Sequence, residues 1–317
     1  MANTTAASST RRKEGYWARL FKSLNRTKFL QLLLLPGLIY YIVFQYVPMY
    51  GVIIAFKDYK IREGILGSDW VGLQHFKDFF NYMYSWRIIR NTVLLNFYNL
   101  IFGFPMPIIF AILLNEVRNL RYKKFVQTIS YMPHFISTVS IVGILTMILS
   151  PTSGIVNVLI SKLGGTPIYF MTRPEWFRTI YVASGVWQDL GWDAIIYIAA
   201  LASVNQELYE AAVIDGASRL KQIWHVSLPG IRSTIVIMLI MRMGSMMSSN
   251  TDKVLLMQNE LTYDVSDIIG TYVYRRGIRD ADYSYSTAVG LFNSVINVIF
   301  VVAANTIAKK LGESSLW

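Results

Sequence analysis

The sequence contains no cysteine and only three histidines among its 317 residues. The lack of cysteine excludes a disulfide framework, thiol catalysis and a cysteine metal site. His75, His134 and His225 are not spaced as metal ligands, so no metal site is expected. The chain also lacks a nucleophile elbow and a phosphate loop of the form G-x-x-x-x-G-K-S/T. The sequence therefore predicts a chain without an enzymatic site and without a cofactor of its own.

Charged residues are scarce as well. They make up 15% of the chain, against 54% hydrophobic residues and a mean hydropathy of +0.39. A soluble domain has roughly 25% charged and 45–50% apolar residues, so this composition indicates a membrane protein. The formal net charge is +11. In a membrane protein such an excess is explained by lipid headgroups and topology, so we expect membrane lipid and no nucleic acid as a partner.

Long apolar runs recur along the sequence, and a membrane-spanning helix needs about 20 largely apolar residues. The candidate spans are residues 29–56, 91–114, 125–149, 178–202, 231–247 and 285–308. Arg232 and Arg242 interrupt the fifth run, which a helix packed inside a bundle tolerates. The predicted fold class is an all-α integral membrane protein with six transmembrane helices.

Basic residues indicate the orientation of these spans. Seven Lys or Arg lie in residues 1–28, four in the loop 118–124, and Lys309 and Lys310 near the end of the chain. An even number of spans places all of these on one side, which the positive-inside rule makes cytoplasmic for both termini.

The predicted organisation follows from this topology. It comprises a basic cytoplasmic tail 1–28, a peripheral first span 29–56, an extracytoplasmic loop 57–90, a core 91–308 that includes an inner loop 203–230, and a cytoplasmic tail 309–317. Aromatic and leucine residues recur at helical spacing in the first tail, which favours an interfacial helix. A disordered tail is the alternative.

The inner loop is the most informative segment. Residues 207–215 and 218–225 predict two short helices, with Gly216 at the bend and Ser218 as a residue that can cap the second helix. Pro229 is expected to stop the second helix. Small side chains around the bend would let another surface approach the backbone closely: Ala211, Ala212 and Ala217. A surface hairpin without a partner is the alternative.

This loop resembles the EAA signature of the permease subunits of type I ABC importers, the binding-protein-dependent uptake systems. In that family the loop is a coupling helix that sits in a groove of a cytoplasmic ATPase subunit. The resemblance implies ATPase coupling by Glu210, Ala211, Ala212, Asp215, Gly216, Ala217, Leu228 and Pro229. One departure is Ser233, where many members have proline.

Further segments narrow the resemblance to one branch. They are similar to carbohydrate-uptake permeases associated with lipoprotein binding proteins, which take up oligosaccharides and polysaccharide fragments. The segments are 56–59, 70–76, 127–137, 191–192, 195–200, 271–275 and 283–292. The resemblance implies a location in the bacterial cytoplasmic (inner) membrane. It also implies a homologous second permease, two ATPase subunits that bind ATP and Mg, and an extracytoplasmic sugar-binding protein.

Polar residues near the middle of two spans are candidates for a translocation path. The fourth span carries Gln188, Asp189, Trp192 and Asp193, and the fifth carries Arg242. Asp189 and Asp193 are one helical turn apart, so both could line a path for a polyhydroxylated ligand. The alternative is an ion pair of Arg242 with Asp189 or Asp193 that fixes helix packing, and the two roles can coexist.

The predicted outer loop 248–282 is long for a bundle connection. Tyr272, Tyr274, Arg275 and Arg276 make it a candidate for docking the binding protein, and a solvated cap without a partner is the alternative. Aromatic rings beside guanidinium groups would also suit acidic sugars such as uronates.

Together these features predict the permease subunit of an ATP-driven sugar importer. An ion-coupled secondary sugar transporter is the alternative. Such a transporter is expected to show an inverted internal repeat, which the sequence does not display. A scaffold or receptor without transport activity is a third possibility.

Overall fold

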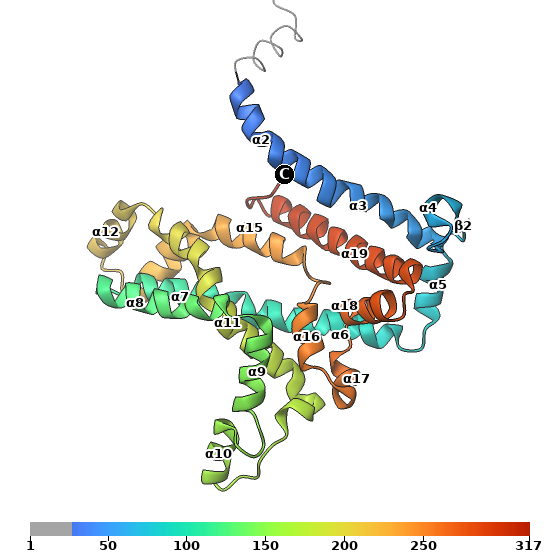
Figure 1. Ribbon diagram of the computed structural model, residues 1–317. Coiled ribbons are helices and arrows are strands. Elements are labelled where there is room, and N and C mark those ends of the chain that lie inside the picture. The colour runs from blue at the N-terminus through green and yellow to red at the C-terminus, as the bar shows by residue number, and fades with distance from the viewer. Residues whose placement is uncertain (1–26) are drawn as a thin grey trace, which may run out of the picture. The chain divides into compact units, whose positions relative to one another are not determined.

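The computed structural model describes residues 27–317, so the interfacial helix predicted within residues 1–28 lies outside the described residues. The chain divides into two compact units, Met1–Ile53 and Ile54–Trp317. The described part of the first unit is helical throughout (Figure 1). Its elements are α2 (Lys28–Tyr41), the π-helical turn η1 (Ile42–Tyr46), α3 (Val47–Met49) and the start of the 3₁₀ helix η2 (Tyr50–Phe56).

The second unit is also mainly helical, and its described strands are β1 (Lys57–Asp58) and β2 (Asp69–Trp70), paired antiparallel. The helices before the central helix are α4 (Gly64–Gly67), α5 (Gln74–Asn81), α6 (Ser85–Tyr98), η3 (Asn99–Gly103), α7 (Pro105–Asn115), α8 (Leu120–Tyr131), η4 (Met132–Phe135), α9 (Thr138–Ile148), α10 (Ile155–Lys162) and η5 (Phe170–Thr172). The central helix α11 (Pro174–Ala202) is followed by α12 (Gln206–Ile214), α13 (Arg219–Gln222), η6 (Ile223–Ser227), α14 (Leu228–Gly230), α15 (Arg232–Met243), α16 (Thr251–Met257), η7 (Glu260–Thr262), α17 (Tyr263–Ser266), α18 (Ile269–Tyr274), η8 (Arg275–Arg279) and α19 (Tyr283–Lys310).

Three helical stretches are long and apolar enough to cross a membrane: Lys28–Phe56, Ser85–Asn115 and Tyr283–Lys310. Two bent helix pairs raise the number to five if each pair is one span. The helix α11 has the length of a span, with Gln188, Asp189 and Asp193 in its second half, but it is not among these five. The count of six spans therefore stays a prediction.

The third predicted span, residues 125–149, is not one continuous helix. The run Leu120–Phe135 and the helix Thr138–Ile148 meet at 101°. Pro133 lies in the 3₁₀ turn that ends the first part, where its ring removes a backbone donor. Ser137 then caps α9 by accepting a hydrogen bond from the backbone N–H of Ser140. The break is thus encoded by a proline followed by a capping serine.

The fifth predicted span, residues 231–247, is shorter than expected. Its helix α15 ends at Met243 and meets the preceding run Arg219–Gly230 at 61°. Residues beyond it, predicted as an outer loop, are largely helical and contribute to the core. Val254, Met257 and Ile268 pack in one apolar cluster with residues of α6, α9 and α11. The segment 248–282 is therefore not a simple solvated cap.

The helix α11 packs against α7 and α8 (Figure 1). Ala194, Tyr197 and Leu201 on α11 pack in one apolar cluster with Ile108 and Ala111 on α7. On the side of α8, a Cβ atom added at Gly191 would overlap the backbone carbonyl of Ser130. Gly191 thus allows a close approach between the two helices, which holds α11 against the bent third segment.

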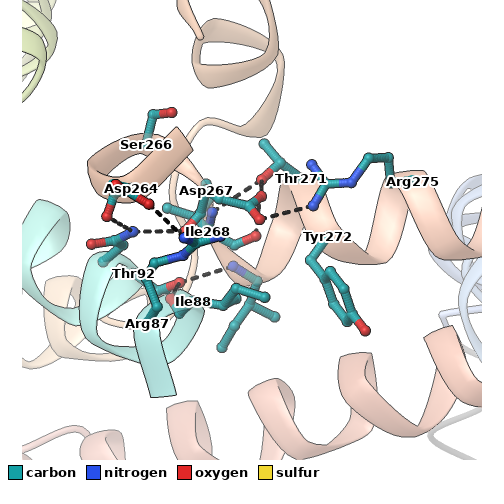
Figure 2. A network of polar contacts seen from close by, with 12 residues as sticks. Arg87, Ile88, Thr92, Asp264, Ser266, Asp267, Ile268, Thr271, Tyr272 and Arg275 are labelled. Atoms are coloured by element: carbon teal, nitrogen blue, oxygen red, sulfur yellow. Dashed lines mark hydrogen bonds and ion pairs between the residues drawn. The ribbon is translucent and has the colours of Figure 1, made fainter. Parts of the chain in front are cut away.

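A polar network joins α6 to the segment that contains α17 and α18. Asn91, fully buried on α6, donates hydrogen bonds to the backbone carbonyls of Asp264 and Asp267, at 3.0 and 3.1 Å. Figure 2 shows the Asp267 carboxylate between Thr271 and Arg275. Thr271 Oγ1 donates to Asp267 Oδ1 at 2.9 Å, and Arg275 Nη2 donates to Asp267 Oδ2 at 2.8 Å.

Burial by itself lowers the pKa of Arg275, but the hydrogen bond and the charge of Asp267 outweigh it and raise the pKa above its usual value. The Asp267 side chain is only 5% exposed. Asp267 and Arg275 therefore form a charged pair that stabilises the outer segment only as long as both partners are present.

We predict that Gly191→Ala lowers the thermal unfolding midpoint of the purified protein in detergent. The added methyl group would press against the backbone of α8, and such overpacking costs about 1–3 kcal/mol. Gly143→Ala is the matched control, because it lies inside α9 with no atom within 4 Å of an added Cβ. Alanine is better than glycine inside a helix, so the control should not lower the midpoint. Equal midpoints for the two variants would contradict the close approach.

A second prediction concerns the two aspartates of the network. Asp267→Ala leaves Arg275 without its carboxylate, and breaking a buried pair in this way costs about 3 kcal/mol. The Asp264 side chain is 78% exposed and pairs with Arg87. Asp264→Ala removes only this pair and should cost about 1 kcal/mol or less. Thermal unfolding in detergent measures both. A decrease in the unfolding midpoint for Asp264→Ala as large as that for Asp267→Ala would be inconsistent with this ranking.

Candidate functional site

The predicted path residues meet at one polar cavity of about 140 Å³. Four of the five predicted residues line it: Gln188, Asp189 and Asp193 on α11 and Arg242 on α15. The rest of the wall includes Asn96, Asn99, Gly103, Pro107, Tyr181, Gly185, Val186, Leu190, Ser248, Ser249, Asn250 and Lys253. The cavity therefore joins α6, η3, α7, α11, α15 and α16, which are far apart in the sequence.

Trp192, the fifth predicted residue, does not line this cavity. Its ring stacks on His134, with centroids 4.4 Å apart and an interplanar angle of 4°. His134 Nδ1 lies 2.9 Å from Asp189 Oδ1. Gln188 Nε2 donates to the backbone carbonyl of Ile136 at 3.3 Å. These side chains of α11 thus also hold the bend between η4 and α9.

His134 was not predicted as a partner of the path. Pro133, at the break of the third predicted span, directly precedes His134, but the sequence does not show which residue the imidazole contacts. The spacing of Asp189 and Trp192 on α11 is the signal that could have indicated it, because residues three apart on a helix lie on one face.

Lys253 was also missed, because it lies on α16 in a segment predicted to be an outer loop. The residue is 3% exposed, and its Nζ donates to the backbone carbonyl of Tyr181 at 3.4 Å and lies 5.2 Å from the centre of the Tyr181 ring. Burial lowers the pKa of Lys253 to about 8. The charge of Asp189, which lines the same cavity, acts against this lowering.

Arg242, Asp189 and Asp193 line the same cavity, and the predicted pairing of Arg242 with the aspartates of α11 stays a prediction. Within residues 27–317, no ion pair within 4.0 Å joins Arg242 to Asp189 or Asp193. Asp189 contacts His134 instead. Arg242 lies in the last turn of α15, where the helix dipole favours a cation.

The inner loop has the bend that the sequence predicts. The Asn205 side chain caps α12 by accepting from the backbone N–H of Glu207 at 3.0 Å. After α12 the chain turns at Gly216, whose φ is +72°, a conformation that glycine adopts at little cost. The N–H of Ala217 donates back to the carbonyl of Ala212 at 2.8 Å, which closes the turn.

The second half of the loop differs from the prediction in two details. The Ser218 side chain makes no capping hydrogen bond. Pro229 does not stop the second helix at residue 225, because the helical run continues from Arg219 through the π turn η6 to Gly230. Pro229 is placed near the start of α14, where its missing N–H costs little.

The surface of the loop combines apolar and charged groups. Glu210 is exposed, with no hydrogen bond or ion pair of its carboxylate among the described residues. Val213, Ile214, Leu220 and Trp224 are exposed as well, and Ile214 is 85% exposed. Arg219 Nη1 lies 3.5 Å from Glu116 Oε2 just after α7, so the loop contacts the α7–α8 connection. An apolar exposed patch with an unpaired acid is typical of a protein contact.

The docking candidates have different surroundings. Tyr272 is buried, and its hydroxyl lies 2.9 Å from that of Tyr285. The prediction that Tyr272 docks the binding protein is therefore wrong, because the residue belongs to the core. Arg275 forms an ion pair with Asp267. Arg276 Nη2 lies 3.0 Å from Asp282 Oδ2 and is partly exposed. Tyr274 is exposed. Only Tyr274 and Arg276 therefore offer surface to a partner.

Comparisons with known proteins agree with this geometry. The sequence profile described as "Binding-protein-dependent transport system inner membrane component" matches residues 103–313. Protein LplB of Bacillus subtilis is 48% identical over 93% of this chain and 93% of its own length. The polygalacturonan/rhamnogalacturonan transport system permease protein YteP of the same species is 45% identical over 94% of this chain and 93% of its own length.

Solved structures show the same fold. A chain of a bacterial ABC transporter involved in the import of the acidic polysaccharide alginate has a TM-score of 0.85 and 41% identity, over 92% of this chain and 99% of that one. A chain of a bacterial alginate ABC transporter in complex with an alginate pentasaccharide-bound periplasmic protein has a TM-score of 0.86 and 40% identity. The match covers 94% of this chain and 100% of that one. This chain belongs to the inner membrane components of binding-protein-dependent transport systems, the permease subunits of ABC importers.

Proposed function

We propose that this chain forms half of the translocation path of an ATP-driven importer of oligosaccharides or polysaccharide fragments. The observation that carries the proposal is the polar cavity between α6, α11, α15 and α16 in a permease of this family. Amide, hydroxyl and charged groups in one wall suit a polyhydroxylated ligand. In a bundle that is otherwise apolar, such groups mark a substrate pathway.

The substrate class is supported by the relatives. YteP is named as a polygalacturonan and rhamnogalacturonan permease, and the two solved transporters import or bind alginate. All three act on polysaccharides or their fragments. We propose the same class of substrate for this chain.

The partners follow from the family. A binding protein is part of such systems by definition, and one solved relative is in complex with a periplasmic binding protein. We propose in addition a homologous second permease and two ATPase subunits that bind ATP and Mg. In this arrangement the complex lies in the bacterial inner membrane, with both termini of this chain in the cytoplasm.

The inner loop is the proposed contact with an ATPase subunit. Gly216 and the small residues Ala212 and Ala217 keep the bend narrow, and Glu210 offers a charge without an internal partner. Asp215 and Ala211 flank the same bend, and Leu228 and Pro229 lead into α15. On the opposite side, we propose that Tyr274 and Arg276 contact the binding protein.

The proposal is tested by reconstituting the full complex in liposomes with labelled oligosaccharide. Uptake should require ATP together with the binding protein, and it should persist when proton and sodium gradients are dissipated. Uptake that follows an ion gradient without ATP would instead support the secondary-transporter alternative.

Glu210→Lys is predicted to uncouple this complex without unfolding it. The substitution reverses a charge at an exposed position, so stability should change by about 0.5 kcal/mol or less. Sugar-stimulated ATPase activity should fall about tenfold or more, because like charges across a protein contact are strongly unfavourable. Glu63→Lys, at an exposed acid in the segment 57–90 that lies 3.8 Å from Lys60, is the control. Normal sugar-stimulated ATPase activity in an assembled Glu210→Lys complex would contradict the assignment of the loop to ATPase coupling.

A further inference from the structure

A second, largely apolar groove lies beside the polar cavity. It has a volume of about 660 Å³ and runs between α6, η3 and α7 on one side and the first half of α11 on the other. Ligand pockets usually have volumes of about 300–1,000 Å³. Only Val186 lines both the groove and the polar cavity. The groove is therefore a separate site, which the proposed function does not use.

The apolar part of the groove follows two helical faces. Tyr98, Phe102 and Met106 recur at intervals of four residues on one side, and Phe102 is 56% exposed. The opposite side consists of Thr179, Val182, Ala183 and Val186 on α11. The eight residues from position 178 to position 186 span about 12 Å of helix. This length is close to half of a hydrocarbon core of about 30 Å, so the groove has the depth of one lipid leaflet.

Arg178 and Glu175, one turn apart on α11, form the charged end of the groove. Arg178 Nη2 donates to Asn91 Oδ1 at 3.0 Å, but Arg178 Nε is buried without a hydrogen-bond partner. The charge of the exposed Arg90 acts unfavourably on Arg178. Within residues 27–317, no ion pair within 4.0 Å involves Arg90, Glu175 or Arg178. This end therefore offers groups of both signs to a ligand.

The charged end lies at the boundary of two predicted spans. Arg90 directly precedes the span 91–114, and Arg178 is the first residue of the span 178–202. Residues at the ends of a spanning helix lie at the level of the lipid headgroups. In this placement the apolar part of the groove lies in the hydrocarbon region, whichever side of the membrane the charged end faces.

We propose that this groove binds a phospholipid with an ethanolamine headgroup. Arg178, with Arg90 beside it, binds the lipid phosphate, and Glu175 accepts hydrogen bonds from the ammonium group. One acyl chain lies along the apolar part of the groove. The proposal is independent of the sugar that the transporter carries.

The charges of the groove favour this headgroup over others. A guanidinium binds a phosphate through two parallel hydrogen bonds, which suits Arg178. A purely anionic headgroup, such as that of phosphatidylglycerol, offers no cation to Glu175. The ammonium of ethanolamine has three N–H donors, as a lysine ammonium does, whereas the quaternary ammonium of choline has none. A helix of another chain would fill the apolar part, but it would leave Arg178 and Glu175 unpaired unless it carried both charges.

The test measures lipid binding to the complete transporter in detergent by native mass spectrometry. The probes are palmitoyl-oleoyl phospholipids with ethanolamine, glycerol or choline headgroups, which share their acyl chains. Glycerophosphoethanolamine is added as a probe that has the headgroup without the chains. The wild-type complex should bind the ethanolamine lipid about tenfold more tightly than the other two lipids, as expected for charge-assisted contacts. It should bind glycerophosphoethanolamine more weakly than the lipid, because the apolar contacts are missing.

Variants assign the binding to this groove rather than to another surface of the complex. Arg178→Gln should weaken binding of the ethanolamine lipid about tenfold, and Glu175→Gln should remove only the preference over the choline lipid. Arg173→Gln, at an exposed arginine just before α11 that does not line the groove, is the matched control. Ala183→Phe fills the groove from an exposed position and should displace the lipid without removing a charge. This variant replaces Arg178→Gln if the latter does not assemble.

Equal binding of the three lipids by the wild-type complex would overturn the inference, as would an ethanolamine preference that survives both Arg178→Gln and Ala183→Phe. Binding of glycerophosphoethanolamine as tight as that of the lipid would overturn it too, because the site would then recognise a free phosphate ester. Absence of bound lipid, with crosslinking of Ala183→Cys to another subunit, would assign the groove to a protein helix instead. None of these outcomes affects the proposed function, which depends on ATP-dependent uptake.

Discussion

The packing of the polar, partly exposed side chains of α11 is the constraint on which the rest of the structure depends. Gln188 and Asp189 lie on a helix that packs against apolar neighbours on α7, and each has a partner inside the protein. The bent segment from η4 to α9 provides two of these partners, the Ile136 carbonyl and His134. Both side chains also line the cavity, where we propose that the ligand passes.

The same arrangement connects the inner loop to the cavity. The helix α15 begins two residues after Gly230 at the end of the loop, and it ends just after Arg242 in the cavity wall. Twelve residues of helix span about 18 Å, so α15 is the element that separates Arg242 from the 61° bend at which the loop ends. In the proposed function α15 is the connection between the loop, which we propose to contact the ATPase subunit, and the cavity, which we propose to hold the substrate.

Much of this organisation could be predicted from the sequence, because it depends on local signals. The bend at Gly216 follows from composition, and helical spacing indicates the shared face of α11 that brings three of the five path candidates to one cavity. The roles of Lys253 and His134 could not be predicted, because each depends on which helices pack together. Tyr272 was placed at the surface because its neighbours are polar, whereas its ring packs inward against Tyr285.

The central claim is that sugar passes through the cavity beside α11, and the absence of native cysteine allows a direct test. Ser249→Cys places a single thiol in the cavity wall, and Ser294→Cys places one on an exposed face of α19 away from it. In the ATP-trapped complex, a membrane-impermeant maleimide added from outside should label residue 249 but not residue 294, and bound oligosaccharide should slow that labelling. If residue 249 stays unreactive in every state, or reacts without protection by sugar, the path does not run through this cavity.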